Sequence, residues 1–217
     1  MKTIVITGAG KGIGFELTKQ LCSKNKVYAV CRKASDELKN LSCEVIEGID
    51  ITEESSIARL QKELKGISID LLLNNAGIAI WKEEPNLKEN ILKQIEVNAI
   101  APLMVTRALE NNLSEGSVVI MMSSRMASIS DNTSGKSYGY RASKTALNSL
   151  TKTLTFELDP KGIITCLMHP GSVSTEMNPR GQIKTKECVE KLIKRIENVK
   201  KQDSGKFLRF DEGEIAW

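Results

Sequence analysis

Histidine and cysteine, residues often used for metal binding and covalent catalysis, are scarce or unsuitably spaced in this sequence. Its 217 residues include one histidine, His169, which argues against a histidine-based metal site and against a Ser-His-Asp triad. The five cysteines are odd in number and lack metal-ligand spacing, so we interpret them as reduced thiols of a cytosolic protein. We therefore expect no metal site.

Long apolar runs and flexible linkers are also missing. No stretch reaches membrane-spanning length, and strand-like residues begin at position 2, which leaves no room for a signal peptide. No Pro/Gly/Ser-rich segment divides the chain, so we predict one cytoplasmic domain over residues 1–217, without a membrane partner. The net charge of +4 is modest, and the basic residues between 184 and 201 are interleaved with glutamates, which favours a solvated face over a nucleic-acid surface.

β-Strand and helix patterns alternate along the whole chain. Helical patterns fill most intervals between the strands, for example over 53–64 and 87–112. This alternation predicts an α/β fold, a single doubly wound Rossmann domain with a mostly parallel, seven-stranded sheet. Ligands of such sheets bind outside the carboxyl ends of the strands. The strand-like runs lie at residues 2–7, 26–31, 43–48, 69–73, 116–122, 163–168 and 206–210.

A glycine-rich segment, Thr-Gly-Ala-Gly-Lys-Gly-Ile-Gly at residues 7–14, follows the first predicted strand and precedes a helix. Glycines at this place let the backbone approach a pyrophosphate, which then lies against free N–H groups of the helix. Lys11 is followed by Gly12 and not by Ser or Thr, so the segment is not a P-loop. We predict that a dinucleotide binds at Gly8, Lys11, Gly12, Ile13 and Gly14.

Tyr140 and Lys144 lie one turn apart on the same face of a predicted helix. A free phenol has a pKa near ~10 and exchanges protons poorly at neutral pH. A lysine one turn away stabilises the phenolate, so we expect it to lower that pKa toward the working range. An ordinary helix with a surface tyrosine and lysine is the alternative, which the glycine-rich segment disfavours.

With these motifs the chain resembles the short-chain dehydrogenase/reductase family from end to end. Within the family it is most similar to the sniffer-like carbonyl reductases and the bacterial C-factor proteins, through segments 138–144, 169–171 and 207–217. The resemblance implies hydride transfer between a nicotinamide dinucleotide and a carbonyl or alcohol carbon. In it Tyr140 gives the proton and Lys144 also binds the ribose. The catalytic set that it implies is Asn98, Ser124, Tyr140 and Lys144.

The serine of this set is one of two neighbours. Residues 118–122 read as a strand that ends at Ser123 and Ser124, and successive strand residues face opposite ways. Only one of the two serines can therefore point at Tyr140. The family match selects Ser124, with Ser128 as the alternative.

Asn98 matches the asparagine of the family, and the sequence adds a physical reason. Residues 87–112 look helical, yet Pro102 lacks the N–H that would bond the Asn98 carbonyl. We expect this free carbonyl to hold a water molecule that links Lys144 to bulk solvent. A helix kink that only aids packing is the alternative.

The end of the second predicted strand favours NADP(H) over NAD(H). In NAD enzymes of this architecture an acidic residue there holds the ribose hydroxyls, whereas arginine suits a 2′-phosphate. Residues 28–33 read Tyr-Ala-Val-Cys-Arg-Lys. We predict that Arg32 binds the phosphate, helped by Lys11 and by Lys33. The alternative is a solvated basic strand end and NAD(H) as cofactor.

The family resemblance assigns the remaining cofactor contacts. In relatives an acid after the third strand contacts the adenine, a turn of small residues after the fourth runs beside its ribose, and the segment after the sixth holds the nicotinamide carboxamide. An acid that only caps the next helix is the alternative for Asp50. Residues 176–205 correspond to a short substrate-loop region. The assigned residues are Asp50, Ile51, Asn75, Ala76, Gly77, Pro170, Val173 and Thr175.

The prediction for function is an NADPH-dependent reductase of aldehydes or ketones, whose partner is a small carbonyl or alcohol substrate. Relatives pair through the two long helices beside the site, so by analogy we expect a homodimer or homotetramer. Two alternatives stay open. One is an NAD-dependent alcohol dehydrogenase, and the other is a C-factor-like signalling protein that binds the cofactor.

Overall fold

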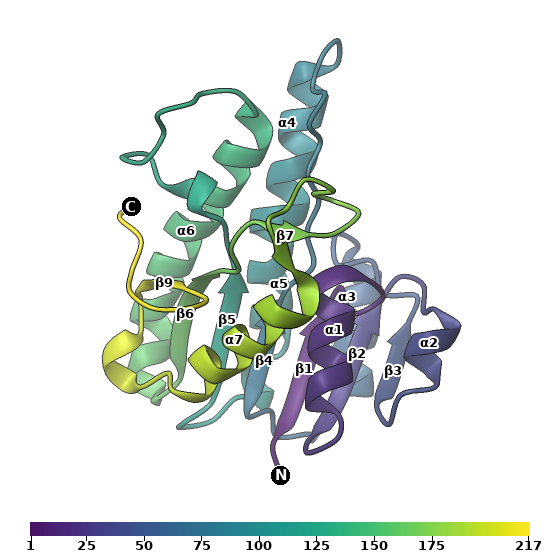
Figure 1. Ribbon diagram of the computed structural model, residues 1–217. Coiled ribbons are helices and arrows are strands. Elements are labelled where there is room, and N and C mark those ends of the chain that lie inside the picture. Colours follow the sequence, from purple (N-terminus) through teal and green to yellow (C-terminus); the bar gives the residue numbers. More distant parts are fainter.

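A parallel sheet of seven strands, in the order β3-β2-β1-β4-β5-β6-β9, forms the centre of the molecule. The computed structural model describes residues 1–217 and shows helices on both sides of this sheet (Figure 1). The predicted α/β class and the seven-stranded parallel sheet are confirmed. The strands are β1 (Thr3–Thr7), β2 (Lys26–Cys31), β3 (Glu44–Glu47), β4 (Leu71–Asn74), β5 (Val118–Met122), β6 (Ile164–His169) and β9 (Phe207–Arg209).

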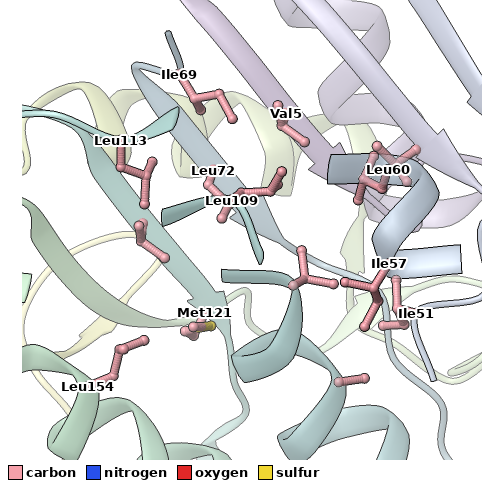
Figure 2. Packing of buried hydrophobic residues seen from close by; sticks show 14 of the residues in the cluster. Val5, Ile51, Ile57, Leu60, Ile69, Leu72, Leu109, Leu113, Met121 and Leu154 are labelled. Carbon is pink, nitrogen blue, oxygen red and sulfur yellow. The ribbon is translucent and has the colours of Figure 1, made fainter. Parts of the chain in front are cut away.

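Successive strand residues supply two separate cores, one on each face of the sheet. In β1, Val5 packs in one core, whereas Ile4 and Ile6 pack in the other. Both faces of the sheet are covered by other residues of these cores, so all of these side chains are buried and the run is continuously hydrophobic. Figure 2 shows the first core, where Val5 and Leu72 of the sheet lie near side chains of the covering helices.

The helices divide between the two faces. Residues of α1, α2 and α7 contribute to the core of Ile4 and Ile6, and residues of α3, α5 and α6 to the core of Val5. None of them combines the length and apolar character that crossing a bilayer requires. The helices are α1 (Gly12–Leu21), α2 (Asp36–Lys39), α3 (Glu54–Glu63), α4 (Leu87–Ile95), α5 (Ala101–Ala108), α6 (Tyr138–Leu158) and α7 (Thr185–Glu197).

The prediction of one continuous helix over 87–112 is wrong in one respect, because a π-helical turn at Glu96–Ile100 separates α4 from α5. In this turn the N–H of Ala101 bonds the carbonyl of Glu96, five residues earlier. Pro102 follows directly and cannot donate, so the wide turn lies where the regular ladder would fail. Asn98 lies in the middle of the turn and is buried.

The segment after β6 is more ordered than the sequence suggests. A small parallel pair, β7 (Val173–Ser174) and β8 (Ile183–Lys184), was not predicted. β8 and α7 occupy much of the predicted substrate-loop region 176–205, and β7 lies just before it. The irregular residues between β6 and α7 are 170–172 and 175–182.

Candidate active site

The predicted site residues lie mainly in segments that follow β1, β2, β4, β5 and β6 and at the start of α6. Because the sheet is parallel, all these strands end at the same edge. In Figure 1 the strand arrows point toward the edge above which the β7 segment lies. The fold therefore collects residues that are far apart in the sequence around one region.

The glycine-rich segment packs directly on the turn after β4. A Cβ added at Gly8, where φ is +68°, would lie 2.7 Å from the Cα of Ala76. A Cβ at Gly14 would lie 2.3 Å from the carbonyl oxygen of Gly8 and 2.5 Å from Nδ2 of Asn75. Side chains at these two positions would push the turn and the helix apart, so the glycines are required for the close approach.

Polar contacts fix the same two segments to each other. The Thr7 hydroxyl accepts hydrogen bonds from the backbone N–H groups of Asn75 and Ala76, both at 3.1 Å. The Asn75 side chain donates to the carbonyl of Thr7 at 3.0 Å. Thr7 and Asn75 thus set the shape of the loop from which α1 begins.

The start of α1 fits the phosphates of a dinucleotide. No side chain caps this ten-residue helix, and its first turn contains no acidic residue. Its N-terminal N–H groups are therefore free to bind an anion, without competition from a carboxylate of the first turn. Lys11 adds a cation beside them, and its Nζ lies 2.6 Å from Oε2 of Glu176, in the segment after β7.

The residues predicted to bind a 2′-phosphate and the adenine lie together after β2 and β3. Nη1 of Arg32 is 3.8 Å from Oδ2 of Asp50, and the Arg32 side chain is 73% exposed. Oδ1 of Asp50 accepts bonds from the N–H and the hydroxyl of Thr52, at 3.0 and 2.8 Å. Burial raises the pKa of Asp50, but these bonds and the Arg32 charge outweigh it and hold that pKa below its usual value. Asp50 stabilises its own turn, and Arg32 stays accessible to an anion.

Tyr140 and Ser124 meet where β5 ends. Burial raises the pKa of the Tyr140 phenol, and a hydrogen bond with the Ser124 side chain lowers it in part. Ser123 faces elsewhere, because its hydroxyl donates to Oδ1 of Asn148 at 2.7 Å. The alternative candidate, Ser128, bonds within the following turn, where it accepts from the N–H of Asp131 at 3.2 Å.

Lys144 lies one turn beyond Tyr140 on α6, as the spacing predicts, and is buried. Its Nζ donates to the carbonyl of Met122 at 2.8 Å, and burial lowers the pKa of Lys144 to about 8. The expected lowering of the Tyr140 pKa by this lysine is not found, because burial raises that pKa and Ser124 alone lowers it in part. The phenol is therefore protonated at neutral pH.

The Asn98 side chain holds the turn after β4 against α6. Its Oδ1 accepts from the N–H of Ile78 at 2.8 Å, and its Nδ2 donates to the carbonyl of Ile78 at 2.8 Å and to the Ser143 hydroxyl at 3.0 Å. The Ser143 hydroxyl donates in turn to the backbone carbonyl of Tyr140. A Cβ at Gly77 would lie 3.0 Å from Oδ1 of Asn98 and 3.6 Å from Nζ of Lys144. Asn98, Lys144 and Gly77 are thus close neighbours.

The residues assigned to the nicotinamide end lie just before the predicted substrate-loop region. Pro170 and Val173 are buried, and Val173 pairs with Ile183 in the small sheet. The hydroxyl of Thr175 accepts from the N–H of Asn178 at 3.2 Å. A Cβ at Gly12 would lie 3.7 Å from Cγ2 of Thr175, so the glycine-rich segment and this loop adjoin each other.

Residues 80–83 of the β4–α4 segment make contacts that no sequence motif predicts. The Trp81 ring lies against the Tyr140 ring, with centroids 5.2 Å apart. The Glu83 carboxylate is buried and accepts from the N–H of Gly139, next to Tyr140, at 2.6 Å. The sequence offers one signal, that one of its two tryptophans follows the Asn-Asn-Ala-Gly turn closely.

The single histidine predicts a pH-dependent stability. Burial, helped by Arg209 and Arg125, lowers the pKa of His169 from 6.5 to about 4, and Asp211 opposes the shift. The unfolded chain therefore takes up a proton below pH 6.5, whereas the folded protein does so only near pH 4. Stability that is present above pH 6.5 is lost as the pH falls through this window, by up to roughly 3 kcal/mol. Urea denaturation of wild type and His169→Gln between pH 4 and 7 measures this loss of stability. Parallel pH profiles of the unfolding free energy for the two proteins would contradict the role of His169.

Comparison with known proteins agrees with this geometry. A family model described as short chain dehydrogenase matches residues 2–186. A 1-hydroxy-2-glutathionyl-2-methyl-3-butene dehydrogenase of Rhodococcus sp. (strain AD45) is 32% identical over 226 residues, which cover 100% of both chains. The C-signal of Myxococcus xanthus is 33% identical over 154 residues, which cover 69% of this chain and 93% of that protein.

Solved structures show the same likeness. The carbonyl reductase Sniffer of D. melanogaster superposes with a TM-score of 0.89 at 27% identity and full coverage of both chains. The NADPH-bound carbonyl reductase from chicken fatty liver superposes with a TM-score of 0.86 at 28% identity, covering 100% of this chain and 99% of that one. With a family model that matches most of its length and a relative that aligns from end to end, this chain belongs to the short-chain dehydrogenase family.

Proposed function

We propose that this protein is an NADPH-dependent reductase of aldehydes or ketones in which Tyr140 donates the proton. The observation that carries the proposal is the position of the Tyr140 phenol next to the Ser124 side chain, which follows β5 and partly offsets the rise of the Tyr140 pKa. Lys144 and Asn98 lie beside them, and a glycine-rich loop that fits a dinucleotide begins at the end of β1. A protein that only binds a dinucleotide does not need this set of four polar side chains, which are Asn98, Ser124, Tyr140 and Lys144.

Each of these side chains has a definite task in the proposed reaction. Bound NADPH supplies the hydride. The Ser124 hydroxyl holds the carbonyl oxygen, and the Tyr140 phenol, protonated at neutral pH because burial raises its pKa, gives this oxygen a proton. Lys144, with a pKa of about 8, is still mostly cationic at pH 7 and stabilises the phenolate that remains.

The choice of NADPH rests on the accessible cations near the start of α1 and the end of β2. Arg32 is exposed and has only a distant carboxylate partner, Asp50, at 3.8 Å. Lys11 and Lys33 are both exposed, and the backbone of Lys33 adjoins the glycine-rich segment, since a Cβ at Gly10 would lie 2.8 Å from the Lys33 carbonyl oxygen. The chicken carbonyl reductase that resembles this chain is itself bound to NADPH.

We expect Arg32→Ala to weaken NADPH binding by about 10- to 100-fold while NADH binding stays within about twofold, because one charge-assisted contact to a phosphate is lost. Cofactor fluorescence titration measures both affinities. Lys19→Ala, which removes an exposed cation from the last turn of α1, is the matched control. If the affinities for NADPH and NADH fell equally, or not at all, the proposed contact of Arg32 with the 2′-phosphate would be wrong.

Two relatives support alternative physiological roles for the same site. The Rhodococcus protein is named as a dehydrogenase of an alcohol, so oxidation of alcohols with NADP should be assayed beside reduction with NADPH. The Myxococcus protein is named as a signal, which makes a signalling role the second candidate. Rescue of a deletion phenotype by the Tyr140→Phe protein would favour signalling over turnover.

A further inference from the structure

Trp81 connects the catalytic helix with the loop after β7. Its ring is tilted by 51° against the ring of Tyr140, with centroids 5.2 Å apart. Its indole N–H donates to the backbone carbonyl of Met177 at 2.8 Å. One side chain from the β4–α4 segment therefore contacts both the proposed proton donor and the loop that borders the site.

The backbone on either side of Trp81 is anchored, so the indole is held in place. The N–H of Ile80 donates to Oε1 of Gln94 at 2.9 Å, and Gln94 is fully buried. Two residues after Trp81, the buried Glu83 carboxylate bonds the N–H of Gly139 at the start of α6. These contacts fix the segment to α4 and α6, and a rotation of the indole would break its bond to Met177.

Trp81 and Met177 nevertheless present apolar surface to solvent. The Trp81 residue is 47% exposed and Met177 is 40% exposed. The exposed part of this aromatic ring lies next to a reactive group. Burial of that apolar surface against an apolar ligand is favourable in free energy. A charged or strongly hydrated substituent would gain nothing there.

We propose that Trp81 is a specificity-determining residue that selects aldehydes and ketones whose carbonyl bears a flat apolar group, aryl or conjugated alkenyl. This inference rests on the proposed function, because the carbonyl must lie at Tyr140 and Ser124 for its substituent to reach the indole. The bond from the indole to Met177 keeps the loop next to the same substituent.

The test compares benzaldehyde with propanal as substrates of wild type, Trp81→Ala and Trp81→Phe. We expect Trp81→Ala to raise KM for benzaldehyde about tenfold and to change kcat/KM for propanal by less than about threefold. Trp81→Phe, which keeps a ring, should retain most of the benzaldehyde preference. Tyr138→Ala is the matched control, since Tyr138 is an exposed aromatic residue near the site, at the first position of α6. An equal loss for both aldehydes, or no change, would overturn the inference.

A binding measurement separates this inference from the proposed function. The chain has two tryptophans, so in Trp217→Phe the emission comes from Trp81 alone. Benzyl alcohol, the product of benzaldehyde reduction, should shift this emission at concentrations where 1-propanol does not. A shift without turnover of either aldehyde would contradict the proposed function, and with it the role of Trp81 in selecting carbonyl substrates. Turnover of both aldehydes without a shift would overturn the inference about Trp81 and leave the proposed function standing.

Discussion

Replacing Tyr140 by phenylalanine is expected to lower kcat for carbonyl reduction by about 10²- to 10⁴-fold, because the proton donor is removed while the ring is kept. The ring contact with Trp81 and the helix start at Tyr138 do not depend on the hydroxyl. NADPH binding should therefore change by less than about threefold. Steady-state turnover, followed by NADPH absorbance, and a cofactor titration measure the two quantities.

Tyr138→Phe is the control for this experiment, because it removes a phenol two residues earlier, on an exposed side chain of the same helix. It should keep wild-type turnover. A Tyr140→Phe enzyme that retained more than about a tenth of its activity would refute the proposed role of the phenol. Ser124 would then be the next residue to test.

The second large effect is expected for Asn98→Ala, which should lower the free energy of unfolding by about 2–5 kcal/mol. The substitution leaves the partly buried N–H and carbonyl of Ile78 without their partner, and an unpaired buried polar group costs about 1–3 kcal/mol. The Ser143 hydroxyl also loses the hydrogen bond that it accepts from Nδ2 of Asn98. Urea denaturation gives the loss of stability directly.

Asn148→Ala provides a matched comparison for Asn98→Ala. Asn148 is likewise a buried amide, but it accepts one hydrogen bond, from the Ser123 hydroxyl, and does not contact the turn after β4. We expect both variants to be less stable and only Asn98→Ala to lose turnover at a temperature where both are folded. Equal activity of the two folded variants would show that Asn98 contributes to packing alone.

The strands could be predicted because each leaves a local signal. Runs such as Ile4–Ile6 are rich in β-branched residues and are flanked by glycine or charged residues. All seven predicted strands are present in the sheet. The π-helical turn could not be predicted, because Pro102 shows where the helix ladder fails but not how the chain closes the gap. The β7–β8 pair was missed since two-residue strands have no measurable periodicity.

The site was predictable to the extent that its motifs are local. Tyr140 and Lys144 follow from helix spacing, and the opposite orientations of Ser123 and Ser124 follow from strand geometry. The contact of Trp81 with Met177 joins residues 96 positions apart and has no local signature. The direction of the Tyr140 pKa shift depends on burial, which spacing cannot reveal.

The parallel sheet has a consequence for how activity is acquired. Its neighbouring strands cannot pair through a hairpin, so every pairing requires a complete crossover of the chain. The glycines proposed to bind the cofactor phosphates belong to the first tenth of the polypeptide, and Tyr140 lies beyond its midpoint. Neither half of the protein contains a working set of residues, and return of catalysis after denaturation will report assembly of the two halves into one sheet.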